Sequence, residues 1–311
     1  MAARSPRQRI LVIKHGALGD FILAIGPFAA IRAQHRRDEI VLLTTAPYAR
    51  LAEVSPYFDR VWVDTRPPWW SPGAVLRLRR RLRGAGFARV YDLQTSHRSS
   101  AYYRLFGRAK PEWSGIARGC SHPHRNLRRD TMHTIERQRE QLADAGIAEV
   151  PAPDLGWLDG DLAGLDLPAR FVLIVPGGAA HRPAKRWPPA AFAALIERLA
   201  AMRLGAVLLG GVADREAIEA IHELAPGAIE LCGKTSLGQI AALARRASAA
   251  IGNDTGPMHL IAALGCPSVV LFSRESDPEL SAPRGPSVRI IAVDDLATLA
   301  PDVVTASITL R

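Results

Sequence analysis

Short apolar runs alternate along the chain with longer segments in which apolar positions recur at helical spacing. In the first half, the short runs predict β-strands at residues 10–14, 40–44, 61–64 and 90–93. The longer segments predict helices at residues 21–34, 47–54, 74–83, 99–106 and 131–145. This alternation is typical of a parallel sheet that is covered by helices.

The second half of the chain repeats this alternation. It predicts strands at residues 171–175, 206–209, 229–231, 249–251, 268–272 and 288–291, and helices at 189–202, 214–224, 237–246, 258–264 and 302–307. Between the halves, residues 146–168 contain three prolines and several Gly–Asp turns, which indicate a linker. A chain of 311 residues favours two domains, expected at 1–155 and 156–311. The predicted fold is α/β, with two doubly wound domains facing each other across a cleft.

The turn at residues 252–259 carries the strongest chemical signal. It separates two apolar runs, so we expect it to join a strand to a helix. The start of such a helix presents backbone N–H groups without partners, and these groups bind anions, phosphate above all. His259 alone is compatible with a core histidine, but near the start of this helix it is also placed to donate to the anion.

A second turn of the same layout follows the first predicted strand. Gly16, Gly19 and Asp20 belong to the sequence Gly-Ala-Leu-Gly-Asp, directly before an apolar helix. The G-x-G-x-x-G fingerprint of dinucleotide-binding proteins is absent. On spacing alone, a helix-capping role for Asp20 is favoured over a chemical one. Together, the two turns suggest transfer of a group from a phosphate-bearing donor.

A glycine-rich loop follows the strand predicted at residues 171–175. It contains Gly177 and Gly178, and then the basic residues Lys185 and Arg186; between them stand Ala179, Ala180, His181 and Arg182. Glycines allow a ligand to approach the backbone, and the basic side chains can neutralise phosphate. The alternative is an exposed basic loop that binds nothing.

The segment 233–236 resembles the end of a phosphate-binding P-loop. That pattern needs a glycine where Ala228 stands, so the sequence does not predict an ATPase. Ser236 is instead predicted to cap the helix that begins at Leu237.

Two further segments resemble metal sites but are interpreted as structural. Asp159 and Asp161 flank a glycine in the linker, where a turn is favoured. The segment 120–124 holds one cysteine and two histidines but has no identified fourth ligand, so a polar loop is favoured. We therefore predict no metal site and no cofactor.

The charge of the chain points to an anionic partner. Its formal net charge is +10, and arginines cluster at residues 77–83 and 118–139. A basic balance attracts nucleic acid, anionic membranes or acidic substrates, but no nucleic-acid motif is present. The alternative is that the clusters are solvated helix faces. Three cysteines without C-x-x-C spacing, and no export signal or membrane-spanning run, favour the cytoplasm.

Together these motifs resemble glycosyltransferase family 9, the ADP-heptose:lipopolysaccharide heptosyltransferases. The resemblance extends from Ile10 to about Phe272. It rests on the turn at 16–20, the Lys-Arg-Trp-Pro sequence at 185–188, the segment 233–237 and the turn at 252–259.

This resemblance implies a GT-B fold of two Rossmann-like domains and an inverting, metal-independent transfer of heptose from ADP-heptose. The N-terminal domain of such enzymes receives the acceptor, and the C-terminal domain binds the nucleotide sugar. Asp20 corresponds to the proposed catalytic base. The donor phosphates and nucleotide are expected to contact Lys185, Gly177, Gly178, Asp254, Thr255, Gly256 and His259.

The expected acceptor is an anionic glycan or glycolipid such as the lipopolysaccharide core. It is expected to contact Gly16 and Gly19, together with Arg125, Arg128 and Arg129. Trp69 and Trp70 precede the arginines at 77–83, which suggests a peripheral contact with the inner face of the inner membrane. Two alternatives stay open, namely a transferase or epimerase of this fold acting on another nucleotide sugar, and a non-catalytic protein that binds a nucleotide sugar or glycan.

Overall fold

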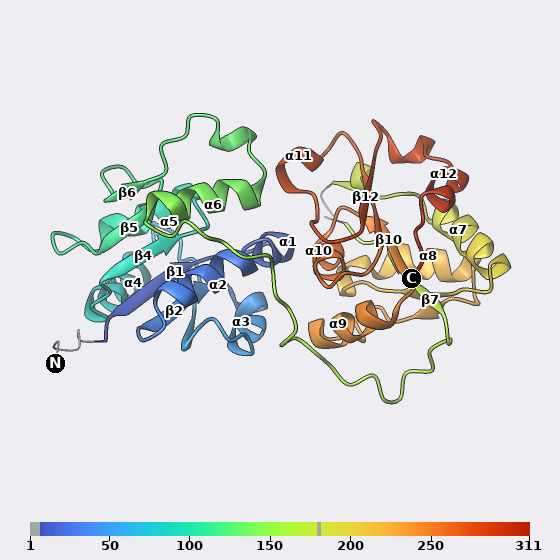
Figure 1. Cartoon of the computed structure of the whole chain (residues 1–311), viewed down its shortest axis with the longest axis horizontal. Helices are drawn as coiled ribbons and strands as arrows, with labels where there is room; N and C mark the ends of the chain where they lie inside the picture. The colour runs from blue at the N-terminus through green and yellow to red at the C-terminus, as the bar shows by residue number, and fades with distance from the viewer. Residues whose placement is uncertain (1–6, 179–181) are drawn as a thin grey trace. The chain divides into compact units, whose positions relative to one another are not determined.

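Two six-stranded parallel sheets form the framework of the protein (Figure 1). The computed structural model describes residues 7–178 and 182–311. The chain divides into two structural units, Met1–Pro153 and Asp154–Arg311, which we call the N-terminal and C-terminal units. Each unit is a sheet with helices packed against it, which confirms the predicted α/β class.

The sheet of the N-terminal unit has the strand order β3-β2-β1-β4-β5-β6. Its strands are β1 (Arg9–Ile13), β2 (Glu39–Thr44), β3 (Arg60–Val63), β4 (Arg89–Asp92), β5 (Glu112–Gly115) and β6 (His122–Pro123). The sequence predicted the first four of these strands and missed the last two. β5 has one large apolar side chain, that of Trp113, and β6 has two residues, so neither forms an apolar run. The interpretation of residues 120–124 as a loop alone was therefore wrong.

The helices of this unit largely follow the predicted segments. They are α1 (Leu18–Ile22), α2 (Ile25–Gln34), α3 (Ala46–Glu53), α4 (Pro72–Gly84), α5 (His97–Leu105), the 3₁₀ helix η1 (Arg129–Thr131) and α6 (Thr134–Asp144). The single helix predicted at 21–34 is two helices, because Pro27 lacks an N–H group and its ring would clash with the carbonyl of Leu23 in a continuous helix. Gly26 is needed beside this break, since a Cβ atom there would lie 2.3 Å from the carbonyl oxygen of Pro151.

Helices lie on both faces of the N-terminal sheet. On one face, Leu11 and Ile13 of β1 pack in a buried cluster with Leu82 of α4 and with Tyr102 and Phe106 of the α5 region. α2 and α6 contact each other. Strand residues therefore alternate between two apolar layers, as a doubly wound sheet requires.

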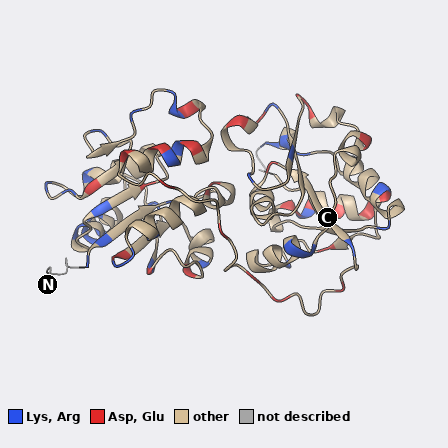
Figure 2. Ribbon diagram, viewed as in Figure 1, with Lys and Arg blue, Asp and Glu red and all other residues tan. Residues whose placement is uncertain are grey.

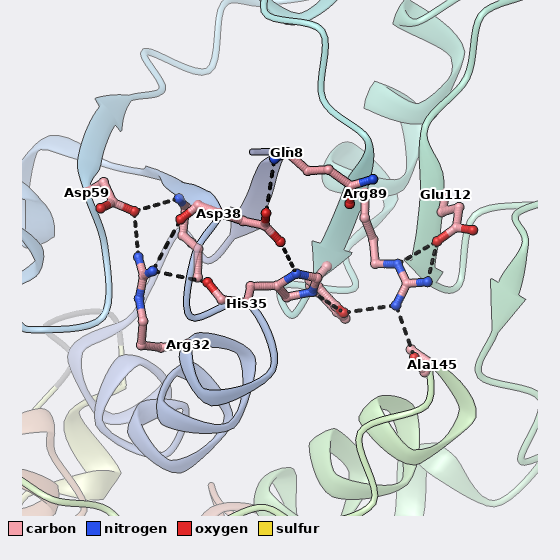
Figure 3. Close-up of polar contacts among 10 residues, drawn as sticks. Gln8, Arg32, His35, Asp38, Asp59, Arg89, Glu112 and Ala145 are labelled. Atoms are coloured by element: carbon pink, nitrogen blue, oxygen red, sulfur yellow. Dashed lines mark hydrogen bonds and ion pairs between the residues drawn. The ribbon is translucent and has the colours of Figure 1, made fainter. Parts of the chain in front are cut away.

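A polar network fastens the amino ends of these strands (Figure 3). Arg32 binds Asp59 at 2.6 Å, while His35 contacts Asp38 and the Tyr91 hydroxyl, each at 2.9 Å. Arg89 donates to the same hydroxyl, to Glu112 and to the carbonyl of Ala145. The network joins β2, β4 and β5 to the ends of α2 and α6. It lies at the amino ends of the strands, whereas the loops described below lie at their carboxyl ends.

The sheet of the C-terminal unit has the strand order β12-β11-β10-β7-β8-β9. Its strands are β7 (Phe171–Val175), β8 (Gly205–Leu208), β9 (Ile229–Glu230), β10 (Ala249–Asn253), β11 (Ser268–Phe272) and β12 (Val288–Ala292). All six correspond to predicted strands. The order of connection reverses between β7 and β10, just as it reverses between β1 and β4 in the other unit. Ligands of such sheets bind at the carboxyl ends of the strands on either side of this reversal.

The C-terminal helices complete the second doubly wound layer structure. They are α7 (Pro189–Ala201), α8 (Arg215–Leu224), α9 (Leu237–Arg246), α10 (Gly256–Ala263), α11 (Pro278–Ser281) and α12 (Pro301–Ala306), with 3₁₀ helices η2 (Pro183–Lys185), η3 (Val212–Asp214) and η4 (Leu296–Thr298). α7, α8 and α12 enclose one apolar cluster, whereas α9 and α10 contact each other. Within the described ranges, no helix combines the length and the apolar character that crossing a membrane demands.

The linker is packed against the C-terminal unit by the two aspartates that the sequence placed in a turn. A Cβ atom at Gly160 would lie 2.4 Å from the backbone nitrogen of Gln239, so α9 touches the linker at this glycine. Asp159 accepts from Arg245 at 3.3 Å, and the carbonyl of Asp161 accepts from Gln239 at 3.0 Å. These contacts give the acid pair a structural role.

Candidate functional site

The carboxyl ends of β7 and β10 bring three predicted donor-site residues together. Lys185, at the end of η2, donates from Nζ to Oδ2 of Asp254 at 2.6 Å. His259, one turn into α10, places Nε2 3.8 Å from Oδ1 of the same carboxylate. The side chains of Lys185, Asp254 and His259 are 13%, 10% and 6% exposed. We call these three residues the Lys185–Asp254–His259 cluster.

The cluster keeps Asp254 ionised. Burial acts to raise the pKa of Asp254, but the interactions with His259 and Lys185 outweigh it and lower the pKa from 3.8 to about 2. Because a carboxylate repels phosphate, we expect Asp254 to act on the donor through Lys185 and His259 and not by direct contact with phosphate. Its contacts instead hold the lysine and the histidine in place. Within the described part of the chain, Nδ1 of His259 is buried and has no hydrogen-bond partner, so one ring nitrogen is left for a ligand.

The start of α10 lies directly beside this cluster. Thr255 is the N-cap residue and makes no side-chain capping bond, and Gly256 is the first helical residue. N–H groups in a first helical turn have no intrahelical partner, and Pro257 has no N–H group at all. The N–H of Gly256 and the Thr255 hydroxyl are therefore the donors that this helix start offers to an anion.

Asp214 holds the glycine-rich loop after β7 in place. The sequence analysis did not select this residue. Oδ1 of Asp214 accepts from the N–H of Gly178 at 3.3 Å, and a Cβ atom at Gly177 would lie 2.7 Å from the same carboxylate. Arg186 donates to the Gly178 carbonyl at 2.7 Å. The Gly178 N–H is thus already occupied, and Gly177 is a glycine because Asp214 fills the space beside it. Residues Ala179, Ala180 and His181 of this loop lie outside the described residues.

Asn253 is the second residue that the sequence analysis missed. It is fully buried at the end of β10, and its side chain donates to the carbonyls of Pro176 and Gly177 and accepts from the N–H of Trp187. It therefore ties both ends of the loop 176–187 to the strand that carries Asp254. A polar residue at the end of an apolar strand was the available signal.

In the N-terminal unit, the predicted turn follows β1 at the point where the strand order reverses. Gly16 has φ +119°, and a Cβ atom there would lie 2.0 Å from Cε2 of Tyr48, so no other residue fits. Gly19 is buried in α1. Asp20 is half-buried in the first turn of α1, and its Oδ2 accepts from the N–H of Ala17 at 3.3 Å. The carboxylate thus supports the helix start, as the capping interpretation expected.

A buried lysine and a buried aspartate lie next to this turn, and neither was singled out from the sequence. Lys14 donates from Nζ to the carbonyl of Leu93 at 3.3 Å. Burial lowers the pKa of Lys14, an effect that Asp20 and Asp92 oppose. Asp92, fully buried at the end of β4, accepts from the N–H of Thr95 at 3.0 Å. Burial raises the pKa of Asp92 to about 6.

A second buried carboxylate fixes the loop after β3. Oδ2 of Asp64 lies 3.0 Å from Nε2 of His15 and accepts from the Tyr102 hydroxyl at 2.6 Å. Its Oδ1 accepts from the N–H of Arg66, whose φ is +47°. The His15 carbonyl in turn accepts from the Thr45 hydroxyl at 2.7 Å. The turn at 16–20 is therefore built on a rigid, hydrogen-bonded base.

The three predicted acceptor arginines differ in their surroundings. Arg125 and Arg128 are exposed. Arg129 turns back to Nδ1 of His124 at 3.4 Å and to Asp130 at 3.1 Å. Arg137 of α6, which the sequence analysis did not select, is partly buried and interacts electrostatically with Asp20. Helix α6 thus brings positive charge toward the turn that holds Asp20.

The structure also bears on the interpretations of two other motifs, Ser236 and the segment 120–124. Ser236 accepts from the N–H of Gln239 at 3.2 Å, which confirms it as the cap of α9. In the segment 120–124, His122 lies 3.8 Å from Glu112 and His124 lies 3.6 Å from Glu140, so the two rings have separate partners.

Comparison with known proteins defines the class to which this fold and site belong. The model of glycosyltransferase family 9 (heptosyltransferase) matches residues 75–305. The chain therefore belongs to this family, and the resemblance found in its motifs is confirmed. Two solved structures share the fold, and their two-domain GT-B architecture is that of this chain.

The individual relatives are more distant. The lipooligosaccharide heptosyltransferase 2 of Haemophilus influenzae is 33% identical over 119 residues, which are 37% of this chain and 34% of that protein. The aligned part thus spans about a third of the length of this curated relative. The ADP-heptose LPS heptosyltransferase II of E. coli superimposes with a TM-score of 0.77 at 24% identity, covering 96% of this chain and 97% of that one. A family 9 glycosyltransferase of Veillonella parvula gives a TM-score of 0.82 at 21% identity, covering 96% and 95%.

Proposed function

We propose that this protein is an inverting, metal-independent glycosyltransferase that moves a heptose from ADP-heptose to a lipopolysaccharide-core or related glycan acceptor. The observation that carries the proposal is the Lys185–Asp254–His259 cluster beside the start of α10, at the reversal of strand order. The family supports glycosyl transfer. The E. coli protein of the same fold is named for ADP-heptose, which supports the choice of donor.

In this proposal the C-terminal unit stabilises the leaving group. When the bond between the sugar and the phosphate breaks, its electron pair goes to the departing ADP, and negative charge grows on the diphosphate. The Lys185 ammonium and the N–H of Gly256 are donors that can share this charge, and the doubly protonated ring of His259 adds a third, with Nε2–H toward Asp254 and Nδ1–H toward the diphosphate. Asp254 keeps Lys185 and His259 aimed while the diphosphate enters and leaves. Fixed cationic and helix-start donors of this kind can stabilise the negative charge of the leaving diphosphate, as a divalent cation does in other transferases.

The N-terminal unit receives the acceptor and supplies the base. The acceptor hydroxyl attacks the anomeric carbon as the phosphate leaves from the opposite face, so one bond forms, one breaks, and the configuration inverts. The hydroxyl proton passes to the carboxylate of Asp20, whose half-buried position leaves it open to a ligand. The exposed arginines Arg125 and Arg128 fit the phosphates and carboxylates of a lipopolysaccharide core. A place at the inner face of the inner membrane stays part of this proposal.

A donor screen by mass spectrometry tests the proposal. The full chain is incubated with a deacylated lipopolysaccharide-core acceptor and with ADP-heptose, UDP-glucose or UDP-N-acetylglucosamine, each with and without EDTA. We expect a product heavier by one heptose from ADP-heptose alone, formed equally with EDTA, with inverted anomeric configuration by NMR. Product from a UDP-sugar instead would assign another donor. Donor binding without product from any donor would identify a binding protein, and loss of product with EDTA would require a metal.

A further inference from the structure

A pocket of about 770 Å³ lies in the N-terminal unit between α5 and the loop that follows β5. Its walls include His97, Ser100 and Arg104 of α5, Lys110 before β5, and Arg118 after it. The volume is that of typical small-molecule sites, which range over about 300–1,000 Å³. The pocket is built from segments other than the turn at 16–20.

The charge of this pocket is uncompensated. Arg104, Lys110 and Arg118 are exposed cations, His97 adds an imidazole, and no acidic side chain is among the lining residues. Among the residues that the structure describes, none of these four side chains forms an ion pair. The nearby Arg89 shows the usual alternative, because it is bound to Glu112 at the first position of β5. Like charges that converge without a counter-charge repel each other, and a bound anion relieves that repulsion.

The walls of the pocket are fixed by contacts of Tyr103. Its ring is buried, and its hydroxyl donates to the carbonyl of Gly119 at 2.9 Å, which anchors the loop after β5. The ammonium of Lys110 lies 4.2 Å from the centre of the same ring. Gly119 has φ +77°, a conformation that glycine adopts without strain, so the loop can turn here and present Arg118. The Lys110 ammonium and the backbone that carries Arg118 are therefore held in place before any ligand binds.

The pocket adjoins the reversal of strand order. Ser100, on its wall, donates to Oδ2 of Asp92 at 3.5 Å, and Asp92 ends β4, the neighbour of β1. We propose that this pocket binds a sugar bearing an oxyanion, a phosphate or a carboxylate, as a second anchoring point for the glycan acceptor. This inference rests on the proposed function for the identity of the acceptor. Guanidinium groups bind such oxyanions through paired hydrogen bonds, and the volume leaves room for the sugar ring.

Calorimetry on the full chain tests the pocket with four probes: glucose 6-phosphate, glucuronate, inorganic phosphate and glucose. The variant is Arg104→Gln with Arg118→Gln. The matched control is Arg36→Gln with Arg37→Gln, which removes the same charge from exposed positions beyond the end of α2. We expect glucose 6-phosphate or glucuronate to bind the parent and the control equally, and to bind the variant at least about tenfold more weakly. Glucose should not bind.

Three results would overturn the inference. One is equal affinity of parent and variant for both charged sugars, and another is an equal loss of affinity in the control. The third is inorganic phosphate binding as tightly as glucose 6-phosphate, because the sugar would then contribute nothing. All these exposed arginines can be replaced without disturbing the core, and unchanged thermal unfolding of the variants checks this.

Lys185→Ala separates this inference from the proposed function. Binding of glucose 6-phosphate that disappears in Lys185→Ala but persists in Arg104→Gln with Arg118→Gln belongs to the C-terminal unit and overturns the pocket. Conversely, absence of transfer from ADP-heptose together with weakened sugar binding in the Arg104 and Arg118 variant would refute the proposed function and uphold the pocket.

Discussion

Replacement of Asp254 by asparagine tests whether the buried ion pair holds the donor side of the site together. The substitution keeps the size of the side chain but removes the charge that Lys185 contacts at 2.6 Å. Asp302→Asn is a matched control in the same unit. Arg198 also contacts Asp302 at 2.6 Å, but the Asp302 side chain is 79% exposed whereas that of Asp254 is 10% exposed. In both pairs a carboxylate contacts a basic side chain at the same distance, so the pairs differ mainly in burial.

The magnitude follows from the pKa of Asp254. A decrease from 3.8 to about 2 corresponds to about 2 kcal/mol of stability at neutral pH, at about 1.4 kcal/mol per pKa unit. Because the pKa is lower in the folded state, this contribution is complete above about pH 5 and declines as the pH falls through 3.8 toward 2. About half of it should be left at pH 3. Asp302→Asn should have no measurable effect, because exposed pairs are screened by water.

The assay is urea unfolding of the full chain at pH 7, 5 and 3, read from the indole N–H signal of Trp187 by NMR. This group donates to the carbonyl of Leu299 at 3.0 Å in the core of the C-terminal unit, so its signal reports that unit alone. Asp254→Asn should lower the unfolding free energy by about 2 kcal/mol at pH 7 and by about half as much at pH 3. Equal effects of the two substitutions, or a penalty that does not change with pH, would refute the reasoning.

Three other predictions concern the N-terminal unit. Asp20→Asn should reduce transfer by about 10²–10⁴-fold with unchanged ADP affinity by calorimetry, and near-normal turnover would leave Asp20 as a helix cap only. Gly16→Ala should lower the thermal midpoint clearly more than Gly119→Ala, since both have positive φ but only Gly16 would place its Cβ atom against Tyr48; equal decreases would contradict this. The helix α4 carries five arginines and no acidic residue (Figure 2), so changing its exposed arginines to serine should weaken co-sedimentation with anionic vesicles at low salt, by about 1 kcal/mol each. Unchanged co-sedimentation of the variant, or equal co-sedimentation of the parent with neutral vesicles, would show that α4 does not bind anionic membranes. The residues changed there are Arg77, Arg79, Arg80, Arg81 and Arg83.

A strand or helix could be predicted from the sequence where its burial in the fold requires a run of apolar residues. The strand at Phe171–Val175 is buried along its whole length, so its five residues are all apolar and its bounds were found correctly. β5 and β6 lie toward the edge of their sheet and contain glutamate, serine, glycine and histidine, so nothing in their pattern marked them. The break between α1 and α2 was readable from Pro27, but the apolar periodicity continues across it.

The candidate site was harder to predict than the fold because its contacts join distant segments. The turn at 252–259 and Lys185 were both recognised, yet the direct bond between Lys185 and Asp254 spans 69 positions and depends on how β7 and β10 pair. Asn253 and Asp214 were missed because each binds backbone groups of another loop, and Asp92 because it binds the backbone of its own loop at Thr95. Of these, Asn253 and Asp92 end apolar strands, and that position is the one local sign of their role.

The network in Figure 3 has a consequence for how this protein can be engineered. His35, Tyr91 and Arg89 fasten the amino ends of the strands through side-chain contacts that do not involve the loops at the carboxyl ends. Under the proposed function, part of the stability of this domain is thus encoded away from the loops that are expected to meet the acceptor. Libraries of random substitutions at the exposed positions among residues 65–71 are therefore expected to yield folded variants more often than libraries at the network itself. Under the proposed function, new acceptor specificities are best sought at these exposed positions.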